Sequence, residues 1–429
     1  MKIVIAYYKD LTRWDVKSFL IPENIGAEHV RLGNFLRKKQ VSWDCTNDVP
    51  MLSLHFGGLF SQRESNNIKG KLFVAEKGDL VYSKIDLRNG AIGVIPENFS
   101  RAVFTTEFPV YEIDASMINP SYLQLYLQSE IFKKLINSIV SGASGRKRVK
   151  PDDFENLFVY APAFSVQEKI VERWQKAQKE ARELKTKASE KEKAIDEFLM
   201  QELGIEKTEH KKRSGAFVVR FKDLDRWDVQ FFAGGINLIA KNFVPLKNAI
   251  RQFENRKTIP RNGIAYHYVG LENVEKNTGK YETINCDGEK IKSQSLVLKK
   301  NCLYYAKLRP YLNKAFLFEG DEEYSIATGE LYGFSVKDGV DTKFILRILL
   351  SELVQNQIKD LMIGARMPRI SEESFENLKI VLPSLKIQKE IVAKIERMRE
   401  EVQKLRHEST EILKTAKNNV QSAIVGKNY

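Results

Sequence analysis

Two long stretches of the chain place apolar residues at the alternating three- and four-residue spacing of a helical seam. The first, residues 166–203, is highly charged and almost free of Gly and Pro. Its seam is Ile170, Trp174, Ala177, Ala181, Leu184, Ala188, Ile195 and Phe198. The spacing recurs later at Ile391, Ile395, Met398, Val402, Leu405, Ser409, Ile412 and Ala416. This heptad pattern predicts two coiled-coil helices, each about 57 Å long at ~1.5 Å per residue.

A seam this narrow leaves most of the helix surface polar, so it is not the face of a helix lying on a globular core. A single exposed helix of this length cannot bury its own stripe, whereas two such helices in one chain can pair. We therefore predict an antiparallel pair with one globule at each end, related by a twofold axis. The alternative is that each helix packs only on its own globule.

Before each long helix, the pattern changes to short alternating apolar segments interrupted by Gly, Asn and Pro, which favours strands. The predicted strands are Lys2–Tyr8, Lys71–Ala75, Asp79–Ser83, Ala91–Ile95 and Ala102–Thr106 in the first half, and Phe217–Phe221, Tyr266–Val269, Leu296–Leu298, Cys302–Tyr305 and Ala315–Phe318 in the second. Each region ends in a predicted helix, residues 122–140 or 343–362. Each half is therefore predicted to be an α/β (α+β) globule.

The chain also repeats itself. Asp10–Phe19 (DLTRWDVKSF) returns as Asp223–Phe232 (DLDRWDVQFF), and the four residues FENL occur twice, at 154–157 and 375–378. After each FENL come a proline and then a glutamine, Pro162 and Gln167 or Pro383 and Gln388. Between these anchors the halves diverge almost completely. A repeated frame around two different interiors predicts one scaffold that presents two different recognition surfaces.

Size and charge narrow the class of protein. With 429 residues, two domains are expected, and apolar runs such as Ile345–Leu350 are too short to span a bilayer. We see no secretory signal pattern. The three cysteines, Cys45, Cys286 and Cys302, lack metal-type spacing and indicate reduced thiols in a cytoplasmic protein. A net charge of +13 permits a polyanionic partner without establishing one.

No pattern in the sequence predicts catalysis. Asn119–Tyr122 resembles the asparagine-proline-proline-aromatic loop of amino-methyltransferases, but the second proline is missing. Its counterpart in the second half is Asp341–Phe344, and Asn or Asp before an apolar helix indicates an N-cap. The five histidines are scattered, and no glycine loop has a cofactor-binding fingerprint. We therefore predict no catalytic residues, no cofactor and no metal.

The basic residues give the better functional signal. A Gly-Ala turn with basic residues occurs at matching places in the two halves, Gly142–Arg148 and Gly364–Arg369. Such turns let backbone amides approach phosphate while guanidinium groups complete the contact. Two matching lysines, each with an arginine nearby, follow predicted strands. The predicted DNA-binding residues are Lys84, Arg88, Arg146, Lys147, Arg148, Lys307, Arg309, Arg366 and Arg369. For any one residue, the alternative is a solvated loop with incidental charge.

Two further matches between the halves are open to more than one interpretation. Trp14 and Trp227, within the repeated Arg-Trp-Asp, are interpreted as core anchors in preference to stacking platforms. Glu107 and Glu330 fit either a buried hydrogen-bond partner, which we favour, or a reader of cytosine amino groups.

Taken together, the chain resembles the specificity subunit of type I restriction–modification systems. The residues that carry the resemblance are Tyr268–Val274 (YVGLENV), the two Gly-Ala basic turns, and the proline-then-glutamine entry into each long helix. The first half has LSLHFGGL, Leu52–Leu59, in place of the motif. The order and duplication of these features span essentially the whole chain.

The resemblance implies two pseudo-twofold-related target-recognition domains, residues 1–162 and 211–383, separated by two long antiparallel coiled-coil helices, residues 163–210 and 384–429. Each domain would read one half of a bipartite site in double-stranded DNA, and the helices would fix the gap between the half-sites. The helices would also dock two methyltransferase subunits, which carry S-adenosylmethionine and the adenine chemistry. Restriction and translocase subunits would join that complex.

Three alternatives belong to other classes. The chain could be the recognition subunit of a related combined restriction–modification enzyme, which only its partners would distinguish. It could be a coiled-coil protein adaptor whose basic charge serves solubility, in which case DNA affinity would not fall steeply with salt. It could also be a complete enzyme, although the missing cofactor and metal motifs argue against this.

Overall fold

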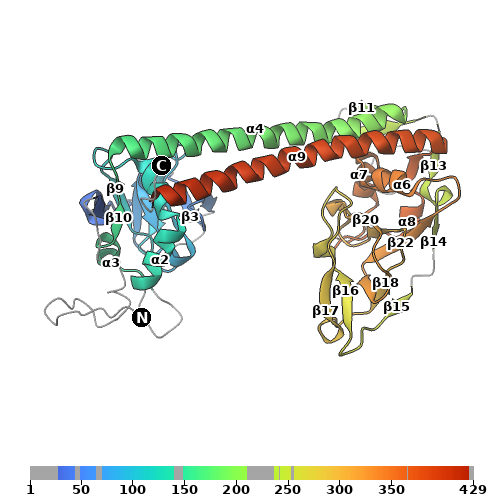
Figure 1. The fold of residues 1–429 in the computed structure, drawn as a ribbon, viewed down its shortest axis with the longest axis horizontal. Coiled ribbons are helices and arrows are strands. Elements are labelled where there is room, and N and C mark those ends of the chain that lie inside the picture. The colour runs from blue at the N-terminus through green and yellow to red at the C-terminus, as the bar shows by residue number, and fades with distance from the viewer. Residues whose placement is uncertain are drawn as a thin grey trace, which may run out of the picture. The chain divides into compact units, whose positions relative to one another are not determined.

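The computed structural model describes residues 28–43, 49–63, 70–139, 148–209, 236–240, 242–252, 256–364 and 366–424 (Figure 1). The repeated segments Asp10–Phe19 and Asp223–Phe232, and with them Trp14 and Trp227, lie outside the described residues, as do the predicted strands Lys2–Tyr8 and Phe217–Phe221. The chain divides into two compact units. The first unit comprises Met1–Leu184 and His407–Tyr429, and the second unit comprises Lys185–Arg406.

The first unit contains two four-stranded sheets and a two-stranded ribbon. In order across the first sheet lie β2 (Leu36–Lys39), β9 (Val110–Ile113), β6 (Leu80–Tyr82) and β7 (Ile92–Val94). Across the other sheet lie β4 (Phe60–Arg63), β3 (Met51–Leu54), β8 (Arg101–Thr105) and β5 (Leu72–Glu76). The ribbon pairs β1 (His29–Arg31) with β10 (Phe158–Tyr160).

The second unit has the same plan with an added strand. One sheet has the order β14 (Ile250–Gln252), β22 (Leu331–Val336), β19 (Cys302–Ala306) and β20 (Ala315–Phe318). The other has the order β15 (Lys257–Thr258), β18 (Ser295–Val297), β21 (Ser325–Thr328), β16 (Ala265–Val269) and β17 (Ile284–Asp287). Two ribbons pair β13 (Phe243–Pro245) with β23 (Lys379–Val381), and β11 (Glu206–Glu209) with β12 (Ile236–Ile239).

The duplication extends through the interiors where the sequences diverge. The order β2-β9-β6-β7 corresponds to β14-β22-β19-β20, and β4-β3-β8-β5 corresponds to β17-β16-β21-β18. In each unit the second of these sheets contains one parallel pair, β3 with β8 or β16 with β21, among antiparallel neighbours. The prediction of two mixed α/β globules built on one repeated scaffold is confirmed.

The predicted helix at the end of each globule is broken in two. The structure has α1 (Pro120–Leu127) and α2 (Glu130–Ile139) in the first unit, and α6 (Thr342–Leu350) and α7 (Glu352–Leu361) in the second. A buried serine lies at each break, Ser129 or Ser351. The Ser351 hydroxyl donates to the Ile348 carbonyl at 2.6 Å, and its backbone is extended. Local hydrogen bonds of this kind compete with helix continuation.

The repeated FENL segments are core anchors. Each begins in a short helix, α3 (Pro151–Glu155) or α8 (Glu372–Glu376), and its phenylalanine is fully buried. The ring of Phe154 lies 4.5 Å from that of Tyr82, and the ring of Phe375 lies 4.7 Å from that of Tyr305. In both units, the carbonyl of the final leucine accepts a hydrogen bond from the first residue of a 3-10 turn that lies much earlier in the chain, Leu32–Asn34 or Leu246–Asn248. Packing therefore accounts for this repeat.

The repeated glutamine joins the globule to its long helix. In the second unit, the Gln388 side chain accepts from the Asp341 amide at 2.8 Å and donates to the Pro383 carbonyl at 2.8 Å. Gln167 makes the matching bonds to Asn119 and Pro162, at 2.9 and 2.7 Å. Both glutamines are almost fully buried.

Those partner residues are themselves helix caps. Asn119 accepts hydrogen bonds from Ser121 and Tyr122 at the start of α1, and Asp341 accepts one from Phe344 at the start of α6. The N-cap predictions are therefore confirmed. One short hydrogen-bond network thus joins the start of α1 to the start of α4, and the start of α6 to the start of α9.

The two long helices are α4 (Phe164–Glu202) and α9 (Leu385–Ile424), and in each unit they pack against one another in antiparallel fashion. In the second unit, Lys191 pairs with Glu401 at 2.5 Å, and the Lys394 ammonium lies 4.2 Å from the Phe198 ring centroid. In the first unit, the hydroxyl of the fully buried Ser409 donates to the Ala181 carbonyl at 2.8 Å. The predicted antiparallel pairing is confirmed.

The helix ends also pack on the globular cores, but the alternative, in which each helix packs only on its own globule, is wrong, because each core includes residues of both helices. In the first unit, Ile170 and Val171 at the start of α4 join the core together with Val420, Ala423 and Ile424 at the end of α9. In the second unit, Ile391, Val392 and Ile395 of α9 share a core with Leu199 and Met200 of α4. Each globular core is thus completed by the beginning of one helix and the end of the other.

Replacing Gln388 by Ala is expected to lower the free energy of unfolding by about 1–3 kcal/mol, because the Asp341 amide and the Pro383 carbonyl lose their buried partner. Urea denaturation followed by circular dichroism measures the change. Gln178→Ala, at an exposed position of α4, is the matched control. Equal stability of the two variants would contradict the assigned role of Gln388.

Replacing Ser409 by Leu is expected to destabilise the helix pair by about 1–3 kcal/mol, because a larger side chain cannot fit against the Ala181 backbone without displacing the helices. The melting temperature should fall measurably in calorimetry. Ser422→Leu, on the exposed side of the same helix, should leave it nearly unchanged. Comparable shifts for both would show that the close approach at Ser409 is unimportant.

Candidate nucleic-acid interface

The lysine of each predicted basic cluster is fixed by backbone hydrogen bonds to two distant segments. In the second unit, Lys307 follows β19 directly, and its amide donates to the Glu330 carbonyl at 3.0 Å. Its carbonyl accepts from the Ile370 amide at 3.2 Å. In the first unit, Lys84 donates to Glu107 at 3.0 Å and accepts from Val149 at 2.9 Å. Three chain segments therefore meet in the same way in both units.

An ion pair lies on each of these frames. Arg369 donates through Nε to Glu330 Oε2 at 3.2 Å and through Nη2 to Oε1 at 3.1 Å. In the first unit, Arg148 Nη2 lies 3.4 Å from Glu107 Oε2. The hydrogen-bonded Glu330 carboxylate raises the pKa of Arg369 above its ordinary value. We call these sets the Lys–Glu–Arg sites: Lys84, Glu107 and Arg148 in the first unit, and Lys307, Glu330 and Arg369 in the second.

The lysine side chains are half-buried and make contacts of their own. Lys84 Nζ donates to the Thr106 carbonyl at 2.7 Å, and Lys307 Nζ lies 5.7 Å from the centroid of the Tyr332 ring. The arginines are more open to solvent, with 53% of the Arg148 side chain and 47% of the Arg369 side chain exposed. The arginines are thus the more accessible cations of each site.

Arg309 is held in an unusual conformation beside the second site. Its backbone is left-handed, with φ of 49° and ψ of 55°, and its amide donates to the Pro368 carbonyl at 2.7 Å. A left-handed residue other than glycine costs on the order of 1–3 kcal/mol and requires firm support from its surroundings. The side chain of Arg309 is exposed, so the strained turn presents a cation at the surface.

Arg88 is not the structural counterpart of Arg309. It is exposed in the 3-10 turn Leu87–Asn89, four residues after Lys84, whereas Arg309 follows Lys307 by two residues. Arg366 is exposed on the second basic turn. Arg146 and Lys147 lie outside the described residues. The structure thus brings Lys307, Arg309 and Arg369 together in the second unit, and Lys84 and Arg148 in the first.

Exposed apolar side chains that the sequence reasoning missed lie on the same turns. Ile363 and Met367 of the second basic turn are 67% and 54% exposed, and Tyr311, next to the strained arginine, is 48% exposed. In the first unit, Phe56 and Leu59 are 60% and 67% exposed at the turn between β3 and β4. The available signal was apolar residues within Gly- or Pro-containing turns, where no core can cover them.

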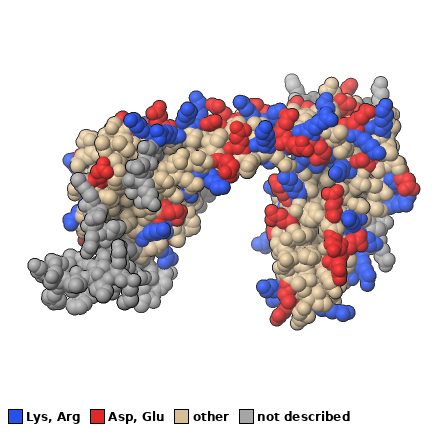
Figure 2. All heavy atoms as spheres, viewed as in Figure 1, with Lys and Arg blue, Asp and Glu red and all other residues tan. Residues whose placement is uncertain are grey.

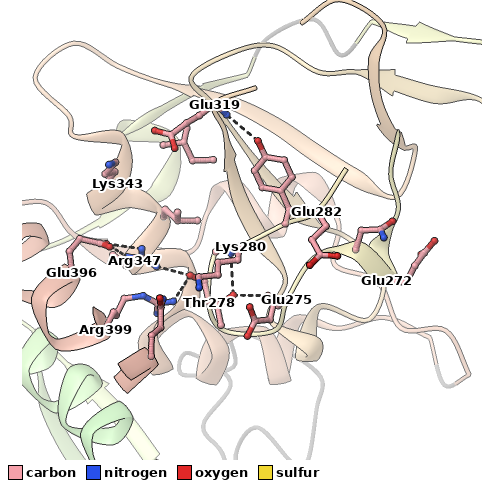
Figure 3. Close-up of a pocket in the computed structure, with 16 residues that line it drawn as sticks. Glu272, Glu275, Thr278, Lys280, Glu282, Glu319, Lys343, Arg347, Glu396 and Arg399 are labelled. Atoms are coloured by element: carbon pink, nitrogen blue, oxygen red, sulfur yellow. Dashed lines mark hydrogen bonds and ion pairs between the residues drawn. The ribbon is translucent and has the colours of Figure 1, made fainter. Parts of the chain in front are cut away.

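The YVGLENV motif lies elsewhere in the second unit. It forms the end of β16 and the following turn, in which the Gly270 amide donates to Asn273 Oδ1 at 3.0 Å. The segment after it lines a cavity of about 740 Å³ together with residues of α6 and α9 (Figure 3). The motif therefore leads the chain from the five-stranded sheet towards the long helix.

Two arginines secure that segment to the helices. Arg347 of α6 pairs with Glu396 of α9 at 2.7 Å and donates to the Thr278 carbonyl at 3.0 Å, and Arg399 donates to the same carbonyl (Figure 3). Arg399 also donates to the Asn277 carbonyl. Burial lowers the pKa of Arg399 to about 10. Since both cations are occupied by protein oxygens, this cavity is a structural joint between the five-stranded sheet and α9.

The surface charge is mixed. On the face shown in Figure 2, basic and acidic side chains are interspersed on the long helices and over the second unit. The net charge of +13 is therefore not gathered into one basic surface on that face. Across the part of the chain that the structure describes, no helix is long and apolar enough to cross a membrane.

Comparisons with known proteins agree with this architecture. Residues 229–414 match the family model described as the type I restriction modification DNA specificity domain. A solved structure concerning complex assembly and conformational transition of the type I R-M system aligns with a TM-score of 0.52 and 14% identity, covering 93% of this chain and 96% of the other. No curated protein matches.

Two further solved structures align over similar lengths. The HsdS subunit from Thermoanaerobacter tengcongensis has a TM-score of 0.42 and 14% identity, with coverage of 93% of this chain and 97% of that one. The S subunit of a type I restriction-modification system from M. genitalium has a TM-score of 0.43 and 9% identity, with coverage of 94% and 97%.

The matched residues 229–414 contain the two sheets of the second unit, its Lys–Glu–Arg site and the α9 residues that secure the motif segment. This part of the chain matches the family of type I restriction modification DNA specificity domains. The resemblance to a type I restriction–modification specificity subunit is confirmed, and the fold of the solved type I R-M structure agrees with it.

Proposed function

We propose that the chain confers DNA sequence specificity on a type I restriction–modification complex, each unit reading one half of a bipartite site in double-stranded DNA. The observation that carries this proposal is the Lys–Glu–Arg site, built by the same backbone hydrogen bonds in two units whose surface turns differ. A constant backbone arrangement that carries different surface turns suits two domains that recognise different DNA sequences.

The basic residues would make two kinds of contact with DNA, to phosphates and to base edges. Phosphate contacts fix register and orientation, while side chains that reach base edges carry specificity. In the first unit these contacts fall to Lys84, Arg88 and the turn residues Arg146, Lys147 and Arg148. In the second they fall to Lys307, Arg309, Arg366 and Arg369. Exposed neighbours such as Tyr311 and Met367 supply apolar surface beside the charges.

The long helices would act as a spacer and as a docking surface. The apolar seams of α4 and α9 pack against each other. Exposed, charged positions on the outer side of α4, such as Lys185, Lys187 and Glu190, are therefore accessible to partner subunits. In this proposal, residues 163–210 and 384–429 separate target-recognition domains 1–162 and 211–383 and bind two methyltransferase subunits. Those methyltransferase subunits supply S-adenosylmethionine and catalyse methyl transfer. Restriction and translocase subunits complete the cytoplasmic assembly. The chain itself performs no catalysis.

Methylome sequencing of a host that expresses the chain with its methyltransferase subunit tests the proposal directly. We expect a split adenine-methylated motif that disappears when the chain is deleted, because partners lacking the specificity subunit cannot locate a site. Unchanged methylation with an active methyltransferase would contradict the proposal and would favour a protein adaptor.

Replacing Arg309 by Ala in the assembled methyltransferase complex should weaken binding at one half-site only, by about 1–3 kcal/mol. Alanine occupies left-handed backbone no more easily than arginine, so the turn bears the same strain in both proteins. Fluorescence anisotropy with DNA altered in either half-site measures the effect. Arg251→Ala, in an exposed ion pair of β14, is the control. Equal loss on unrelated sequences would make Arg309 a phosphate contact.

A further inference from the structure

The geometry of the Arg369–Glu330 pair determines which edge of the guanidinium group is engaged. Glu330 accepts from Nε and Nη2, which form the side edge of the planar group. The end edge, formed by Nη1 and the second hydrogen of Nη2, takes no part in this pair. Two parallel donors on that edge remain directed away from the carboxylate. A guanidinium held in this way can donate to one further bidentate acceptor.

Two acceptors in duplex DNA fit such an edge. Guanine presents O6 and N7 side by side in the major groove, and the phosphate group presents two anionic oxygens. The adjacent carboxylate discriminates between them, because it repels a phosphate approaching the same guanidinium but not the uncharged edge of a base. It also cancels most of the net charge of the arginine. The pair is therefore suited to guanine.

The first unit repeats the pairing of the two residue types, but not the two-donor geometry. Arg148 Nη2 lies 3.4 Å from Glu107 Oε2 as a single ion-pair contact, and the two residues stand on the same backbone frame around Lys84. The sequences between the repeated anchors have otherwise diverged almost completely. The second occurrence is an independent observation that the glutamate and the arginine belong together.

A purely structural role explains the pair less well. The arginine and glutamate side chains are 47% and 32% exposed in the second unit. In the first unit they are 53% and 35% exposed, although Glu107 Oε2 itself is buried. Exposed ion pairs contribute little to stability. The backbone bonds of Lys307 to Glu330 and Ile370 already hold the segments together, so a further exposed pair is not needed for that purpose.

We infer that Glu330 and Glu107 are specificity-determining residues. Glu330 holds Arg369 side-on, and Glu107 pairs with Arg148 through Nη2, so that each arginine donates to a guanine in its own half-site. The inference rests on the proposed function and deepens it by naming the base that each site reads. Each half of the target would then contain a guanine at the position facing this pair.

The test compares Arg369→Lys and Glu330→Gln in the complete methyltransferase complex, using selection from a randomised DNA library. Lysine keeps the charge but not the paired donors, so preference for guanine should fall about tenfold or more at one position of one half-site. Glu330→Gln should relax the same position while increasing affinity for unrelated DNA, because the repulsion of phosphate is removed. A merely misfolded site would lose affinity on all DNA.

Controls separate this inference from the proposed function. Arg251→Lys alters an exposed arginine–aspartate pair beyond the opposite end of β22 and should leave the selected motif intact. Arg148→Lys should relax a guanine in the other half-site. If wild-type complex selects no split motif, the proposed function fails.

If the wild-type motif appears but both substitutions at the second site leave its base preferences unchanged, or weaken all sequences equally, the guanine inference alone is overturned. If Arg369→Lys prevents assembly of the methyltransferase complex, the result for Glu330→Gln decides whether the inference holds. Relaxed preference with stronger binding to unrelated DNA supports the inference, and any other change in base preference or affinity contradicts it.

Discussion

The rest of the structure depends on how each long helix is attached to its globule. A buried glutamine one turn into the helix bonds at once to the proline carbonyl before it and to the backbone amide of a helix cap nearly fifty residues earlier in the chain. A side-chain amide can satisfy a buried donor and a buried acceptor together, which no apolar residue of similar size can do. This junction ties the start of α4 or α9 to the globule that precedes it in the chain.

Around that fixed junction, the two units differ in their exposed turns. The strand order and the positions of the Lys–Glu–Arg sites are held by backbone hydrogen bonds and by buried aromatic rings, neither of which restricts the exposed residues of the turns. The second unit uses this freedom for an extra strand, a longer connection after β16 and the strained Arg309 turn. Stability is thus provided by one set of residues, and surface chemistry by another.

The sequence predicted features whose signals are local. A heptad seam identifies α4 and α9 because periodicity alone defines it, and Asn119 and Asp341 identify helix starts because capping acts within one turn. The breaks at Ser129 and Ser351 escaped prediction, since a serine in an apolar helix indicates a break only once its burial is known. The pairing of Glu330 with Arg369 also escaped, because 39 residues separate them and only the topology of β19, β22 and the basic turn joins them. The one sign of this pair in the sequence was that Glu330 and Arg369 each have a counterpart in the other half, Glu107 and Arg148.

The sharing of helix ends between cores has a consequence for synthesis on the ribosome. The core around Ile170 and Val171 is finished only by Val420, Ala423 and Ile424, which are made after the whole globule of the second unit. Contacts that join such distant parts of a chain form slowly, because a long loop must close before they yield any stabilisation. Until then, the apolar face at the start of α4 stays exposed while the second half of the protein is translated. A nascent chain of this design needs protection from aggregation while its second globule is being made.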